Sequence, residues 1–148
     1  MYGNPIEVTM LISIPTAVGE IADKVTILRI KMKKITVNEK LVNITNECLL
    51  LNSELMKLRE SLTDAQNEKL SAIITQLEQI NLDIWNVEDN IRACEDRKSF
   101  GHDFIQLARN VYKFNDKRAA LKRQINNLVG PKIVEEKSYA KYATEHPV

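Results

Sequence analysis

The chain has 148 residues and a mass of 17.0 kDa, which is the size of one domain and too small for two hydrophobic cores of useful depth. Hydrophobic residues make up 44% and charged residues 28%, so the composition predicts a folded domain over 1–148 and excludes a disordered chain. Because 21 Lys and Arg balance 20 Asp and Glu, the net charge is only +1, and we expect no nucleic-acid partner.

The segment 5–14 alternates apolar and polar residues at its start and is predicted to be extended. An isolated strand leaves backbone groups unpaired, so it needs a partner, either 132–136 or the same segment of a second subunit. The first ten residues lack the basic start of a secretory signal, and no apolar run approaches the roughly 20 residues of a membrane span. We therefore expect a cytoplasmic protein with no membrane partner.

The glycines and prolines lie near the termini or at Gly101, so 20–100 contains no strong helix breaker. Apolar residues spaced alternately by three and four predict a first helix over 17–36. The spacing then slips by one residue, which predicts a turn, Asn38 as an N-cap, and a second helix over 39–60. The first stripe consists of Val18, Ile21, Val25, Leu28, Met32 and Ile35, and the second of Leu41, Ile44, Cys48, Leu51, Leu55, Leu58 and Leu62.

A third helix is predicted over 64–97, after a turn in which Thr63 and Gln66 have capping-box spacing. A fourth helix over 101–129 ends at Gly130, which is followed by a proline. We expect the tail 131–148 to be irregular. The third stripe comprises Leu70, Ile73, Leu77, Ile80, Ile84, Val87, Ile91 and Cys94, and the fourth comprises Phe104, Leu107, Val111, Phe114, Arg118, Leu121, Ile125 and Leu128.

Short links between consecutive helices favour antiparallel neighbours, and the 3.5-residue repeat favours crossing angles of about 20°. The predicted fold is all-α, an antiparallel four-helix, coiled-coil-like bundle with an extended N-terminal segment and an irregular C-terminal tail. At about 1.5 Å per residue the third helix is about 50 Å long and the first about 30 Å. Part of the long hairpin that the third and fourth helices form must therefore project beyond the others or pair elsewhere.

Four separated motifs, in 19–28, 85–92, 108–119 and 134–139, resemble an uncharacterised bacterial and phage helical domain family of unknown function. The resemblance covers most of the chain. It implies a cytoplasmic helical protein and no particular activity.

One charged residue interrupts the apolar stripe of the fourth helix. Arg118 is predicted to point inward, where its guanidinium needs carboxylate or carbonyl partners. Antiparallel pairing places it near Glu78 and Gln79, and places Arg109 near Glu88. Two interpretations remain open, a core ion pair that fixes the helix register and an anion-binding site. The candidate cationic residues are Arg118, Arg109 and Arg92, and the candidate acidic partners are Glu20, Asp23, Glu88 and Asp116.

Glu20 and Asp23 are spaced so that both carboxylates lie on one helix face, as a divalent metal or a magnesium-bound triphosphate requires. All-α nucleotide pyrophosphohydrolases use such a pair with a second acidic pair, which is incomplete here because Ile91 stands three residues after Glu88. Carboxylates at a helix start also stabilise the helix dipole without a metal. We therefore expect neither a metal nor another cofactor.

Two functional hypotheses follow. The first is a non-enzymatic interaction or structural module that forms a homodimer through the projecting helices and the N-terminal segment. The second is a small-anion or nucleotide binding protein or enzyme. Its anion ligands would be Arg109 and Arg118, and its acid, base or metal ligands Glu20, Asp23 and Glu88.

Overall fold

The computed structural model describes residues 11–130 and 138, and within them it contains four helices: α1 (Val18–Lys34), α2 (Asn38–Glu60), α3 (Asp64–Asp96) and α4 (His102–Val129). Each predicted boundary lies within two residues of the observed one, and the all-α fold class is confirmed. Residues 11–17 form neither helix nor strand. The rest of the predicted extended segment and all but one residue of the predicted tail lie outside the described residues.

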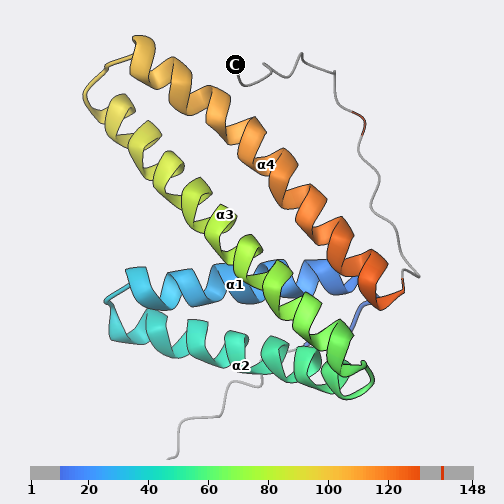
Figure 1. Cartoon of the computed structure of the whole chain (residues 1–148). Helices are drawn as coiled ribbons and strands as arrows, with labels where there is room; N and C mark the ends of the chain where they lie inside the picture. The colour runs from blue at the N-terminus through green and yellow to red at the C-terminus, as the bar shows by residue number, and fades with distance from the viewer. Residues whose placement is uncertain (1–10, 131–137, 139–148) are drawn as a thin grey trace, which may run out of the picture.

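The four helices form two antiparallel hairpins that cross each other (Figure 1). Helix α3 packs along α4, α1 packs along α2, and α1 also contacts both α3 and α4. The far end of the α3–α4 hairpin projects beyond α1 and α2, as the difference in helix length predicts (Figure 1). The shallow crossing predicted throughout the bundle differs from what is observed between hairpins, because α1 crosses α3 and α4 obliquely.

The N-terminal end of α1 lies unusually close to α4. The Gly19 amide donates a hydrogen bond of 2.7 Å to the Asn126 Oδ1, and a Cβ on Gly19 would lie 2.6 Å from the Lys122 carbonyl oxygen. Further along α1, Ala22 and Thr26 are fully buried. These small residues let the α1 backbone approach the second hairpin, which explains why the hairpins cross at this point.

The core lies where α1 meets α3 and α4. Leu77 and Ile125 have no exposed surface, and burial of such a side chain stabilises the fold by about 1.5–3 kcal/mol. Helix α2 contributes one buried side chain, Leu55, which lies outside this cluster. The core cluster consists of Ala22, Leu70, Ile74, Leu77, Ile80, Leu121 and Ile125.

The helix ends follow the sequence at α3 and depart from it at α2. The capping box of Thr63 and Gln66 is confirmed, since the Thr63 hydroxyl accepts from the Gln66 amide and the Gln66 side chain accepts from the Thr63 amide. The prediction of Asn38 as an N-cap is wrong. The helix already begins at Asn38, and Val37, which precedes it, has no side chain able to cap.

Candidate functional site

Three of the residues singled out from the sequence meet in one groove. Its volume is about 550 Å³, and it lies where α1, α3 and α4 come together. Arg118 comes from α4, and Glu88 and Arg92 come from α3. We call it the charged groove; its lining consists of Ile27, Asn81, Ile84, Trp85, Glu88, Asp89, Arg92 and Arg118.

Arg118 is half-buried, and its guanidinium donates a hydrogen bond of 2.6 Å to the Asn115 side-chain carbonyl on the same helix. Its expected neighbour Glu78 turns instead toward α1. There, Glu78 pairs with Arg29 at 3.7 Å and with Lys33 at 3.2 Å. Arg118 therefore has a carbonyl partner, as predicted, but it lies at the edge of a groove and not inside the core.

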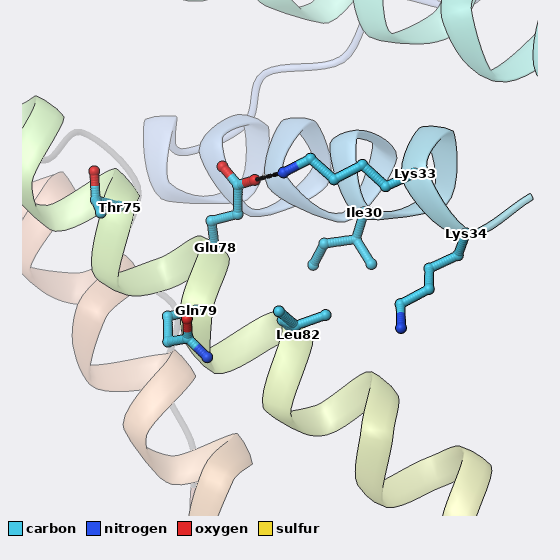
Figure 2. A pocket seen from close by; sticks show the side chains of 7 residues that line it. All are labelled: Ile30, Lys33, Lys34, Thr75, Glu78, Gln79 and Leu82. Atoms are coloured by element: carbon cyan, nitrogen blue, oxygen red, sulfur yellow. Dashed lines mark hydrogen bonds and ion pairs between the residues drawn. The ribbon is translucent and has the colours of Figure 1, made fainter.

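A second groove, of about 340 Å³, separates the C-terminal half of α1 from α3. Figure 2 shows the Lys33–Glu78 ion pair spanning it, with Lys34 on the other side of Ile30 from Glu78. Ile30 and Leu82 form its apolar side (Figure 2). The carboxylate of Glu78, which lines this groove, is thus already paired within the protein.

The charges in the charged groove are also partly compensated. Glu88 Oε2 pairs with Arg92 at 3.1 Å, one turn along the same helix, where the Arg92 side chain is 71% exposed and the Glu88 side chain 42%. Such a surface pair stabilises a helix by about 0.3–0.5 kcal/mol. With Asp89 also lining the groove, two carboxylates stand against the two guanidinium groups of Arg92 and Arg118.

A buried polar network joins α1 to α3 beneath the charged groove. The Asn81 side-chain amide donates hydrogen bonds of 2.9 Å to both the Asp23 carboxylate and the Thr26 hydroxyl. The Thr26 hydroxyl in turn donates to the Asp23 carbonyl at 2.7 Å. The buried Asn81 Oδ1 accepts no hydrogen bond from the described residues. Sequence reasoning missed Asn81, because it lies beside the predicted apolar stripe, which runs through Leu77, Ile80 and Ile84.

The two carboxylates of α1 contact different helices. Glu20 pairs with Lys122 of α4 at 2.6 Å, and the Lys122 side chain is only 11% exposed. Asp23 accepts from Asn81 of α3. Among the described residues no three His, Cys, Asp or Glu side chains form a group that could hold a metal. Arg109 and Asp116 lie on α4 and do not line the charged groove.

The most exposed apolar surface on a helix lies on α2. We define the α2 outer face as Val42, Leu49, Leu50 and Met56, whose exposed fractions are 59%, 64%, 56% and 59%. Three of these residues recur every seven positions and so form one stripe. On the projecting hairpin Phe100 is also exposed and packs edge-on against Phe104. The apolar stripes of α3 and α4 largely cover each other, so the projecting end leaves less apolar surface open than the sequence suggested.

The fold and these surfaces define an all-α protein of two crossed helical hairpins, with a charged groove and an exposed apolar helix face. The chain belongs to a family of unknown function, DUF6165, whose model matches residues 10–147. Membership in a family of unknown function agrees with the resemblance found in the sequence. No curated protein and no solved structure matches the chain. Within the described residues, no helix combines the length and hydropathy needed to cross a membrane.

Proposed function

We propose that this protein is a self-associating helical interaction module that forms a homodimer through the α2 outer face. The observation that carries the proposal is that α2 buries one residue, Leu55, while four large apolar side chains on it face solvent. Apolar residues on two sides of a helix are typical of a helix that packs against a neighbour on each side. In this fold α1 covers one side.

The driving force comes from the area that a second copy would cover. Burial of one large aliphatic side chain is worth about 1.5–3 kcal/mol, so four on each subunit supply enough to offset the cost of association. A surface that is complementary to itself closes into a dimer under two-fold symmetry and leaves no apolar stripe exposed. The dimer therefore covers the exposed apolar surface, and no larger assembly forms through it.

Sedimentation equilibrium in the micromolar range tests the proposal. We expect a species near twice 17.0 kDa for the unchanged chain, and a species near 17.0 kDa for Leu49→Ser. Ile105 on the projecting hairpin is 52% exposed, against 64% for Leu49, so Ile105→Ser is the matched control and leaves the dimer intact. A single species near 17.0 kDa for the unchanged chain overturns the proposal, and loss of the dimer in Ile105→Ser but not Leu49→Ser moves the interface to the projecting hairpin.

A second candidate function is binding of a small anionic ligand in the charged groove. The observation that favours it is the unpaired, buried Asn81 Oδ1, an acceptor that costs about 1–3 kcal/mol when left unsatisfied. A sugar phosphate carries both a hydroxyl donor for Asn81 and an anionic group for Arg118.

A thermal-shift screen against nucleotides, sugar phosphates and divalent metals tests this candidate. A ligand at 100 times its dissociation constant stabilises the fold by about 2.7 kcal/mol. The expected stabilisation by a phosphate compound disappears in Arg118→Met and persists in Lys34→Met, a variant in the second groove. Absence of any shift, or an equal shift in both variants, excludes this use of the charged groove.

A further inference from the structure

We infer that the second copy pairs its own α2 with this α2 in antiparallel orientation, with Leu49 on the two-fold axis. The inference rests on the proposed function and specifies its partner and interface. In such a pair, residue i lies opposite residue 98 − i of the second copy, because both helices run through the axis at position 49. Val42 then lies opposite the second copy's Met56, and Leu49 lies opposite itself.

The stripe suits this arrangement in length and in side-chain size. Val42, Leu49 and Met56 fall within about 40° of one another at about 100° per residue, so they form a narrow seam along four turns of α2. Antiparallel pairing sets the short Val42 against the long, adaptable Met56 at each end. Leu50 lies beside the seam near the axis and extends the apolar contact.

Charged residues flank the two ends of the seam on the same side. Glu39 and Lys57 each lie about 60° from Val42 around the helix, and both are exposed. Antiparallel pairing brings Glu39 within about two residues, or about 3 Å along the axis, of the second copy's Lys57, and symmetry repeats the contact. In a parallel pair the two-fold axis would place these side chains on opposite sides of the seam, and the contact between Glu39 and Lys57 would be lost. Opposite charges beside an apolar seam set partner orientation in paired helices.

The pair that Lys57 forms within its own chain does not prevent this contact. Lys57 lies 2.8 Å from Glu54, and both side chains are more than half exposed. Exposed pairs of this kind contribute about 0.3–0.5 kcal/mol, and a lysine can contact two carboxylates. The charges around the seam therefore favour a second copy of this chain in one orientation.

Single cysteines test the orientation under mild oxidation. Packed helices lie about 8–10 Å apart with Cα atoms about 2.3 Å from each axis, which leaves about 3.4–5.4 Å between two facing Cα atoms. The upper part of this range suits a disulfide, whose Cα atoms lie about 4.4–6.8 Å apart. We expect Leu49→Cys to form a covalent dimer. Cysteines at position 42, or at position 56, each lie about 21 Å from their own copies, so Val42→Cys alone and Met56→Cys alone form no disulfide-linked dimer. An equal mixture of the two variants does form one.

The unchanged chain, with its native Cys48 and Cys94, is the control for disulfides at those thiols. Covalent dimers of all three single variants would show parallel pairing and overturn the inference. A dimer in sedimentation without a Leu49→Cys crosslink would also overturn it while leaving the proposed function intact. A monomer in sedimentation would remove both.

Charge reversal gives an independent readout that needs no cysteine. Glu39→Lys and Lys57→Glu each turn two attractions into repulsions, and we expect each to weaken the dimer about three- to tenfold. The double variant restores opposite charges and returns the dissociation constant to that of the unchanged chain. Equal affinities for all four proteins, or a double variant weaker than either single one, would contradict antiparallel pairing.

Discussion

Replacement of Gly19 by alanine tests the close contact that makes the hairpins cross. The new Cβ would lie 2.6 Å from the Lys122 carbonyl oxygen and 2.9 Å from the Asn126 Oδ1, both well inside contact distance. The first of these atoms belongs to the backbone of α4 and cannot rotate away. Helix α1 must therefore move off α4 by roughly half an ångström or more.

The energetic cost has three parts. Overpacking costs about 1–3 kcal/mol. The same displacement weakens the hydrogen bond from the Gly19 amide to Asn126, which contributes about 1 kcal/mol in the unchanged chain. The ion pair of Glu20 with Lys122 adds no more than about 1 kcal/mol because Glu20 is 43% exposed. These costs are offset in part because alanine has a higher helix propensity than glycine, which stabilises α1 by about 0.5–1 kcal/mol. We expect Gly19→Ala to lower the free energy of unfolding by about 2 kcal/mol.

Urea unfolding followed by circular dichroism measures this loss, with the slope of the transition checked for constancy. Gly101→Ala is the matched control, because a Cβ there meets no atom within 4 Å. It changes only the N-cap of α4 and costs no more than about 1 kcal/mol. If Gly19→Ala is as stable as the unchanged chain, α1 does not approach α4 this closely and the explanation for the crossing fails.

Three further substitutions probe the helix ends and the core. Lys98 has a left-handed φ of 52° after α3, a conformation that strains any residue except glycine. We therefore expect Lys98→Gly to raise the melting temperature by an amount corresponding to about 0.5–1 kcal/mol, and Lys98→Ala to leave it unchanged. Equal melting temperatures for the two variants would contradict the strain. Thr63→Ala lowers stability by about 0.5–2 kcal/mol in urea unfolding and Thr63→Ser retains it, unless the capping box contributes nothing. Ile125→Ala removes a fully buried side chain and costs about 2–5 kcal/mol by calorimetry; a loss below 1 kcal/mol would place Ile125 outside the core.

The sequence predicts the helices well because their signals are local. The shift in apolar spacing near Asn38 and the capping residues at Thr63 depend only on neighbours along the chain, and both turns were located. The detail that failed, Asn38 as N-cap, differs by one residue from the observed start. A single cap is a weak energetic preference of about 1 kcal/mol, which the geometry of the loop before it can override.

The packing of the hairpins was not predictable in the same way. The apolar stripe chosen on α1 contained Ile21 and Met32, whereas the residues that allow the crossing are the small ones, Gly19, Ala22 and Thr26. Periodicity weights large apolar residues and gives no signal for close approach. For the same reason the contact of Glu78 with α1 was assigned to α4, since simple antiparallel pairing ignores a helix that crosses over both.

The candidate site shows a similar division. Arg118, Glu88 and Arg92 were identified from the sequence, and they line one groove because all three face the angle between α1 and the α3–α4 hairpin. The pairing of Asp23 with Asn81 could not be predicted, because it depends on where α1 crosses α3. An asparagine such as Asn81 can be assigned to the buried interior only once the helix that packs over it, here α1, is known.

A search for regular apolar spacing does not detect the apolar residues on the outer face of α2. The stripe toward α1 has apolar residues at both the three- and four-residue spacings, whereas on the outer face Asn46 and Ser53 fill the positions between Val42, Leu49 and Met56. The outer seam is therefore half as dense in apolar residues as a core stripe. In a seam of this density polar side chains separate Val42, Leu49 and Met56 along the helix, so a separated subunit exposes no continuous apolar stripe. We therefore expect the proposed association through α2 to be reversible, so that the weight-average mass rises from near 17.0 kDa toward twice that value as the protein concentration increases.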